Sequence, residues 1–193
     1  MNHTSVSLLE KLRTQPDEAA WRWLDDLYRP LIRRWLLRDP TLRYEAEDLV
    51  QEVLAVVVRE LPHFQHERAG SFRSWLRTIT WNRLQAFWQV RQRRPRLLGS
   101  DSGGSFMSQL EDPHSALSRQ WDEEHDRHVV RRLMELVEPQ FEPDTLQAFR
   151  RIVFDGAKAA DVAAELGISV NAVLLAKSRV LKRLRQEGEG LFD

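Results

Sequence analysis

The sequence predicts an all-α fold with two small helical domains joined by a flexible linker. Apolar side chains recur every three or four residues over most of the chain, and no alternating strand pattern stands next to a turn signal. A stretch rich in glycine, serine and aspartate, Leu97–Ser118, interrupts this pattern. We therefore predict a first domain over residues 1–96, a linker over 97–120 and a second domain over 121–193.

Four helices are expected in the first domain. A short helix lies near Ser7–Thr14, and a second begins near Asp17, a residue type that often caps helix N-termini. The third covers about Glu45–Leu61, and the fourth begins near Ser71. The apolar faces of the second and third are Leu24, Leu27, Tyr28, Leu31, Ile32, Trp35 and Leu36, and Ala46, Leu49, Val50, Val53, Leu54, Val57 and Leu61, respectively.

The fourth helix combines aromatic residues with unbalanced positive charge. Residues 71–95 contain three tryptophans and six arginines but no acidic residue. On a helical wheel Trp81 and Trp88 lie opposite the apolar stripe, near several arginines, which suits stacking on unpaired bases. The alternative is that both rings pack on the second helix and the arginines are solvated. The stripe expected to face the core is Phe72, Trp75, Leu76, Ile79, Ala86, Phe87 and Val90.

Acidic residues gather on the outer face of the third helix, around Glu45, Asp48 and Glu52. This face is either a partner surface or an ordinary solvated face. No histidine or lysine is placed to complete a catalytic site, so an enzyme is not expected. His125 and His128 lie three residues apart near acidic residues, which we interpret as a solvated helix surface rather than a metal site.

The second domain has the outline of a helix-turn-helix. Helices are expected over Trp121–Val137, Pro143–Phe154, Lys158–Leu166 and Val170–Gln186, with Gly167 in the turn and Ser169 as a cap. The last helix is basic, which suits DNA. A three-helix packing domain that does not bind DNA is the alternative. The residues of the last helix expected to face the core are Val170, Val173, Leu174, Val180, Leu181 and Leu184.

Composition narrows the class of protein. The chain has 193 residues and no cysteine, so disulfides and thiolate metal sites are excluded. A net charge of zero conceals 17 Lys/Arg against 12 Asp/Glu in residues 1–96, 4 against 11 in 97–144, and 8 against 6 in 145–193. No apolar run approaches the roughly 20 residues that span a bilayer. We expect a cytoplasmic protein without a membrane partner, a metal site or a cofactor.

Three stretches, taken in order, resemble the bacterial RNA polymerase sigma-70 family, in its extracytoplasmic-function (ECF) group. They are YEAEDLVQEVLAVVVRELPHFQ (44–65), GSFRSWLRTITWNRLQAFWQVRQRRP (70–95) and FDGAKAADVAAELGISVNAVLLAKSRVLKRLR (154–185). The resemblance implies a sigma factor that binds core RNA polymerase, recognises promoter DNA, melts it and starts transcription. It also allows an anti-sigma factor as a partner.

The resemblance assigns a role to each basic or acidic face. The third helix would dock on core polymerase, the fourth would bind the minus-ten element, and the last would read the minus-35 element. The implied core-binding residues are Asp48, Leu49, Gln51 and Glu52. The implied minus-ten residues are Arg73, Arg77, Trp81, Asn82, Arg83, Gln85, Trp88, Arg91, Arg93 and Arg94. The implied minus-35 residues are Ser169, Asn171, Lys177, Ser178, Arg179, Lys182 and Arg183.

The chain departs from the family pattern at two places. Ala86 stands where the family often has an aspartate four residues after the asparagine. In the last helix Leu174, Leu175 and Ala176 stand where the family often has Lys or Arg, Ser and Arg. Either this helix docks with a shifted footprint, or its readout is weak and depends mainly on phosphates.

Two other functions compete with the sigma-factor interpretation. A stand-alone helix-turn-helix regulator that binds duplex DNA would use the second domain alone, and would leave the arginine–tryptophan helix and the acidic face unexplained. A nuclease would need a metal-dependent site, for which the sequence offers no convincing residues.

Overall fold

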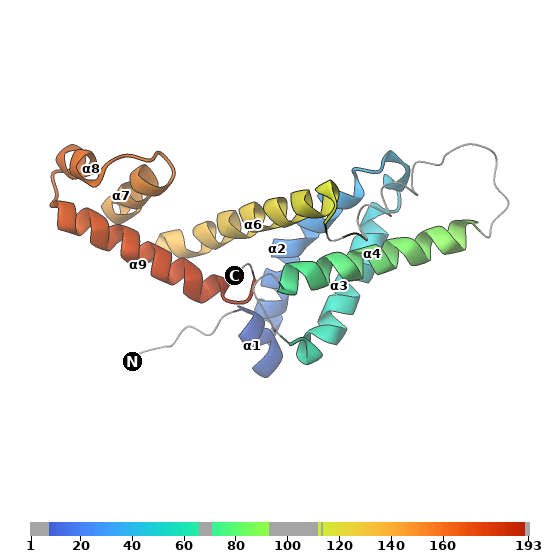
Figure 1. Cartoon of the computed structure of the whole chain (residues 1–193). Coiled ribbons are helices and arrows are strands. Elements are labelled where there is room, and N and C mark those ends of the chain that lie inside the picture. The colour runs from blue at the N-terminus through green and yellow to red at the C-terminus, as the bar shows by residue number, and fades with distance from the viewer. Residues whose placement is uncertain (1–7, 66–70, 93–111, 113, 192–193) are drawn as a thin grey trace. The chain divides into compact units, whose positions relative to one another are not determined.

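The computed structural model describes residues 8–65, 71–92, 112 and 114–191, and the regular elements within these ranges are all helical (Figure 1). The predicted all-α fold is therefore confirmed. The described chain forms two compact units, an N-terminal unit of residues 8–129 with 190 and 191, and a C-terminal unit of residues 130–189.

The N-terminal unit contains most of the helices. They are α1 (Leu8–Thr14), α2 (Glu18–Leu36), the 3-10 turn η1 (Pro40–Leu42), α3 (Ala46–Glu60), η2 (Leu61–His63) and α4 (Ser71–Gln92). Helix α6 (Ala116–Val137) contributes its first part, up to Val129, to this unit. The C-terminal unit continues with η3 (Glu138–Gln140), α7 (Pro143–Val153), α8 (Ala159–Leu166) and α9 (Val170–Gly188).

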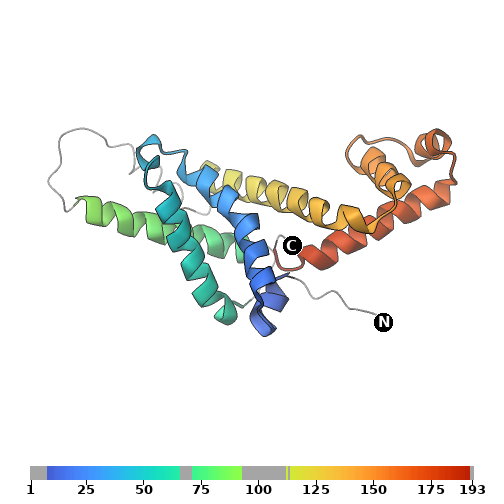
Figure 2. The same ribbon diagram turned by 180° about the vertical axis from the view of Figure 1, so that it is seen from behind.

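Helices α2 and α3 bury the faces that the sequence predicts. Every residue of the two predicted apolar faces is buried, because the three-and-four spacing places them on one side of each helix. The two helices pack against each other, and α4 packs on α3, as both cartoon views show (Figures 1 and 2). The predicted start of α2 is also confirmed, since the Asp17 carboxylate accepts a hydrogen bond from the Ala20 N–H at 2.7 Å.

Helix α4 buries the predicted face in its N-terminal half, where Phe72, Leu76 and Ile79 are buried, but a different face further along. Leu76, Thr80, Leu84 and Trp88 are buried at every fourth position, whereas Val90 is 59% exposed. Side chains four residues apart form a row that is inclined to the helix axis, and such a row faces the partner helix when two helices cross at an angle. A helical wheel assumes that the buried face runs parallel to the axis, so its prediction is wrong toward the C-terminal end of α4. The predictions that Ala86 and Val90 face the core are wrong, and so is the outward placement of Trp88.

Helix α6 begins at Ala116, five residues before the predicted start at Trp121. The end of the predicted linker, residues 116–120, is therefore helical, and Ser118 is fully buried. Most of the remaining linker lies outside the described residues.

The C-terminal unit contains the predicted helix-turn-helix. Gly167 ends α8 with a φ of 65°, a conformation that glycine adopts without strain, and Ser169 caps α9 by accepting from the Ala172 N–H at 3.1 Å. The axes of α8 and α9 turn by 105°, within the range typical of this motif. The packed core consists of Ala148, Val162, Ala163, Val173 and Ala176.

The apolar face predicted for α9 is only partly correct. Val173, Val180 and Leu184 are buried as predicted, but Val170 and Leu174 are exposed. Ala176 is buried in their place, because the face that α7 and α8 cover is narrower than the apolar part of the helix.

Within the described ranges no single helix has the length and apolar character needed to cross a membrane. The bent pair α8 and α9 meets that test jointly, by length and composition only.

Candidate nucleic-acid interface

The outer face of α3 carries exposed acidic groups. The side chains of Asp48, Gln51 and Glu52 are exposed, and neither carboxylate forms an ion pair with a residue that the structure describes. Their neighbours Glu45 and Glu47 are engaged, Glu45 with Arg91 at 2.7 Å and Glu47 with Arg29. The free part of this face therefore lies toward Asp48 and Glu52.

Tyr44 adds an aromatic side chain next to this acidic face. It lies just before α3 and is 90% exposed, the most exposed large apolar side chain among the described residues. Leu49, predicted as a partner contact, is instead buried in the core beneath the face. It supports the helix from inside. Tyr44 was not selected from the sequence, where a single tyrosine before a helix carries no pattern.

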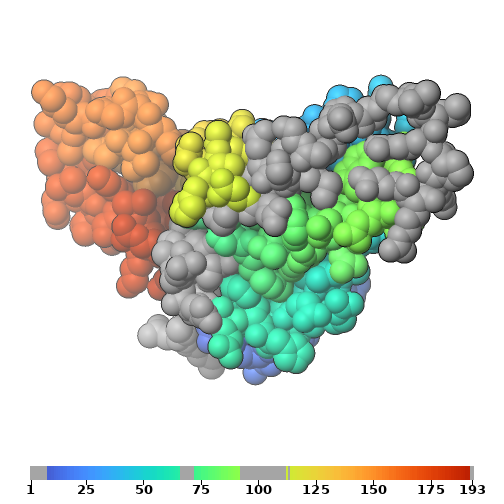
Figure 3. All heavy atoms as spheres, turned by 45° about the vertical axis from the view of Figure 1, so that its right-hand side comes forward, coloured from blue at the N-terminus to red at the C-terminus, as the bar shows by residue number. Residues whose placement is uncertain are grey.

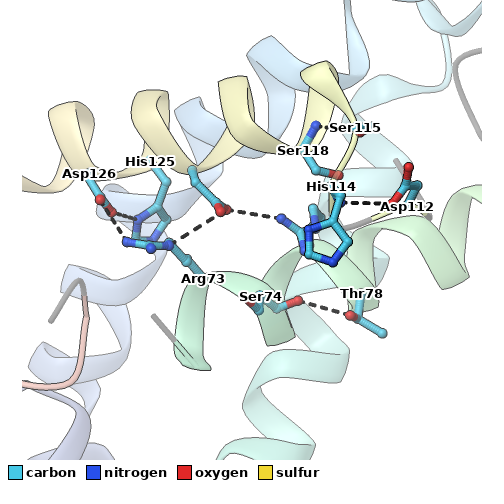
Figure 4. A network of polar contacts seen from close by, with 11 residues as sticks. Arg73, Ser74, Thr78, Asp112, His114, Ser115, Ser118, His125 and Asp126 are labelled. Carbon is cyan, nitrogen blue, oxygen red and sulfur yellow. Dashed lines mark hydrogen bonds and ion pairs between the residues drawn. The ribbon is translucent and has the colours of Figure 1, made fainter. Parts of the chain in front are cut away.

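Helix α4 lies beside α3, and the two form adjoining surfaces of the N-terminal unit (Figure 3). Two of its predicted DNA contacts, Arg73 and Arg77, are already paired. A guanidinium nitrogen of Arg73 lies 2.8 Å from an Asp126 carboxylate oxygen, and one of Arg77 lies 3.1 Å from Asp122. Both aspartates come from the first part of α6, and Figure 4 shows Arg73 directed at Asp126.

The first part of α6 is held on α2 and α4 by buried contacts as well as by ion pairs. Trp121 is fully buried, with its ring 4.9 Å from that of Trp35. Glu124 pairs with Arg38 at 2.6 Å. This part of α6 is therefore an integrated layer of the N-terminal unit.

The interpretation of His125 and His128 as a solvated surface is wrong. Both are buried, because they lie on the side of α6 that faces α2. The His125 ring stacks on Tyr28 with centroids 5.7 Å apart, and its Nδ1 lies 3.0 Å from Asp126. His128 Nε2 donates to the Leu27 carbonyl at 2.6 Å. They join helices far apart in sequence.

Burial shifts the pKa values of groups at this junction. Burial lowers the pKa of His125. The hydrogen bond to Asp126 raises this pKa, but by less than burial lowers it. Burial raises the pKa of Tyr28, with a smaller contribution from Asp126. Burial also raises the pKa of Asp122, although the charges of Arg77 and Arg73 oppose the change. The junction therefore favours a neutral His125 at neutral pH.

The stability of the N-terminal unit is expected to fall as the pH drops below about 6.5, the ordinary pKa of histidine. His125 has a lowered pKa in the folded state, so the unfolded chain takes up the proton first and is stabilised by it. Asp126, Asp122, Arg73 and Tyr28 face this group. The slope from one group reaches at most about 1.4 kcal/mol per pH unit.

Urea unfolding between pH 5 and 8, followed by tryptophan fluorescence, measures this dependence, since all seven tryptophans lie between residues 21 and 121. His125→Gln should flatten the dependence, and His63→Gln, at an exposed position in η2, should leave it unchanged. An unchanged slope in His125→Gln would contradict the assignment.

The remaining predicted contacts on α4 divide by exposure. Asn82 is exposed, and Trp81, Arg83 and Gln85 are partly exposed. Trp88 is only 8% exposed, and the guanidinium of Arg91 lies 5.5 Å from its ring centroid. The partly exposed residues of this surface are therefore Trp81, Arg83 and Gln85, beside the exposed Asn82.

Arg93 and Arg94, also predicted contacts, lie outside the described residues.

The third predicted surface lies along α9. Asn171, Ser178, Arg179 and Lys182 are exposed, and Lys177 is partly exposed. Ser169 is exposed and serves as the helix cap. Arg183 is partly covered, because it donates to Gln140 at 2.8 Å and pairs with Glu187.

Among the described residues no group of three or more His, Asp or Glu side chains is arranged to hold a metal ion.

Comparison with known proteins adds two findings. Residues 24–94 match sigma-70 region 2. The chain is 29% identical over 187 residues to the protein described as ECF RNA polymerase sigma factor RpoE from Cereibacter sphaeroides, an alignment that covers 94% of this chain and 93% of that protein.

Proposed function

We propose that this chain, which belongs to the ECF group of the sigma-70 family, binds core RNA polymerase and directs it to promoter DNA. The observation that supports this most directly is one unit with two unlike exposed surfaces. The acidic face of α3 carries Tyr44, Asp48 and Glu52, and the face of α4 carries Trp81, Asn82 and Arg83. Opposite charge and different chemistry suit two different partners, a protein and a nucleic acid.

The acidic face of α3 is proposed to dock on core polymerase. Tyrosine is among the residue types that dominate protein interfaces, and exposed carboxylates steer a basic partner and fix its orientation. Leu49 and its buried neighbours hold the helix in place without touching the partner.

The face of α4 is proposed to capture unpaired bases of the minus-ten element. Opening duplex DNA costs about 1.4 kcal/mol per base step, and stacking one base on an aromatic ring returns about 1–3 kcal/mol. Of the two tryptophans predicted on this face, Trp81 is partly exposed and is assigned this role, whereas Trp88 is buried. Asn82, Arg83 and Gln85 lie next to it in sequence and supply hydrogen bonds.

The C-terminal unit is proposed to bind the duplex minus-35 element through α9. Its helix-turn-helix geometry and basic side chains support this role. Attachment to polymerase raises the local concentration of both DNA-binding surfaces, so neither needs to bind tightly alone.

The test combines the full-length chain with core RNA polymerase and a promoter library. The expected results are co-elution with core and RNA that starts at selected promoters. Absence of both would overturn the proposal. A sequence-specific gel shift by the chain alone, without effect on polymerase, would favour a stand-alone regulator instead.

Reversing the charge of Asp48 and Glu52 to lysine is expected to weaken core binding at least about fivefold, because exposed charges at an interface mainly contribute complementarity. Binding of labelled chain to core polymerase measures the effect. Glu123→Lys, at an exposed position of α6 in the same unit, is the matched control and should bind normally. If the double variant Asp48→Lys/Glu52→Lys, the control Glu123→Lys and the unchanged chain all bind core polymerase equally well, α3 is not the docking face.

A further inference from the structure

Helix α9 exposes an apolar patch, defined here as Val170, Leu174 and Leu175. These side chains are 44%, 49% and 45% exposed, whereas Val173, Val180 and Leu184 of the same helix are buried. Single exposed leucines are common on protein surfaces, but three neighbouring apolar side chains in the first two turns of one helix indicate a binding surface.

The surroundings of the apolar patch are basic. Asn171 and Ser178 lie on the same helix face as Leu174 and Leu175, at spacings of three and four residues. Lys177, Arg179 and Lys182 follow within two turns. No acidic residue occurs between Leu166 and Gln186. Within α9 the neighbours of the apolar patch therefore include cations and small polar groups but no carboxylate.

This combination fits duplex DNA better than another apolar surface. The cations of α9 can pair with the phosphates of the two DNA strands. The apolar patch between these cations then needs an apolar group of the DNA to contact. The major groove offers one, the C5-methyl group of thymine, which apolar side chains contact in direct readout. In a helix-turn-helix the N-terminal turns of the second helix reach base edges.

We propose that Leu174 and Leu175 read thymine methyl groups in the major groove of the minus-35 element, while Lys177 and Arg179 hold the adjacent phosphates. This rests on the proposed function. It replaces both alternatives that the unusual sequence of α9 leaves open. The helix need not shift its footprint, and its readout is not limited to phosphates, because the leucines themselves discriminate between bases. The preferred duplex would carry adjacent A·T pairs with thymines facing this helix.

Two parallel selections test the proposal. Holoenzyme assembled from the full-length chain and core polymerase selects from a randomised promoter library made with thymine, and from the same library made with uracil, which lacks the methyl group. Thymine should be enriched at two or more adjacent minus-35 positions in the first selection, and uracil should not be enriched there in the second. Replacing the selected thymines by uracil should weaken binding about fourfold for each methyl group lost.

Variants then connect the discrimination to the leucines. The double variant Leu174→Ala/Leu175→Ala should bind thymine and uracil promoters with nearly equal affinity, and each single variant should lose part of the preference. Both positions are exposed, so the variants should remain folded. Val153→Ala, an exposed apolar position on α7, is the matched control and should keep the full preference for thymine.

The outcomes separate this inference from the proposed function. If the holoenzyme initiates at selected promoters but binds thymine and uracil equally, the inference fails and the sigma-factor role stands. If the double variant Leu174→Ala/Leu175→Ala keeps the full thymine preference, the inference also fails. If no promoter is selected and no RNA is made, the proposed function itself fails.

Discussion

Replacing Asp122 and Asp126 with asparagine is expected to raise the affinity of the full-length chain for single-stranded DNA at least about tenfold. Arg73 and Arg77 are paired with these two carboxylates, which compete with DNA phosphates for the same guanidinium groups. Asparagine keeps the size of the side chain but removes its charge. Arg77 is buried and Arg73 is partly exposed. The direct attraction between two charges about 4 Å apart near a protein surface is about 4 kcal/mol, and solvent screening and side-chain entropy reduce the net energy that opposes a phosphate contact.

The salt dependence of binding distinguishes released arginines from a general change in charge. Each phosphate newly neutralised on a single strand should steepen the slope of log K against log salt by about 0.7. Two released arginines therefore predict a change of about 1.4, measurable by fluorescence anisotropy with a labelled oligonucleotide.

Two controls accompany the double variant. Glu123→Gln removes one charge from an exposed position of the same helix and should change neither affinity nor slope by a comparable amount. Adding Arg73→Ala and Arg77→Ala to the double variant should abolish the gain. If the gain persists without these arginines, they are not the DNA contacts that the carboxylates mask.

Trp121→Ala is expected to lower the free energy of unfolding of the N-terminal unit by about 3–5 kcal/mol. Its side chain is fully buried against Trp35, and truncation of a large aromatic side chain leaves a cavity as well as removing apolar contacts. Because Trp121 lies on α6 beside Asp122, we also expect the variant to bind single-stranded DNA more tightly.

Urea unfolding followed by the remaining tryptophans measures the loss. Trp121→Phe retains most of the apolar volume and should cost clearly less than Trp121→Ala. A loss below about 1 kcal/mol for the alanine variant would contradict the docking of α6 on α2.

Features that depend on neighbouring residues could be predicted from the sequence. Asp17 and Ser169 cap their helices, and Gly167 takes the left-handed conformation, because these are contacts within one turn of the chain. The buried faces of α2 and α3 were also predictable, because the apolar residues of each helix lie on one side only and that side must face the core.

Faces with two plausible sides were not predictable. In α4 the sequence predicted a stripe ending at Val90, whereas the crossing of α4 with its neighbour buries a row ending at Trp88. In α9 apolar residues surround more of the helix than α7 and α8 can cover, so Leu174 remains outside. Both results depend on packing partners that a helical wheel does not contain.

The one-dimensional pattern of apolar, capping and charged residues specifies the helices, the helix-turn-helix and the resemblance to the sigma-70 family. The folded structure decides which charges remain available. Arg73 and Asp126 are 53 positions apart in sequence and 2.8 Å apart in space. Helix formation depends on contacts within a few residues, so the local sequence pattern is sufficient to predict the helices. The pairing of Arg73 with Asp126 depends on how α6 packs on α2 and α4, so only the tertiary structure determines it.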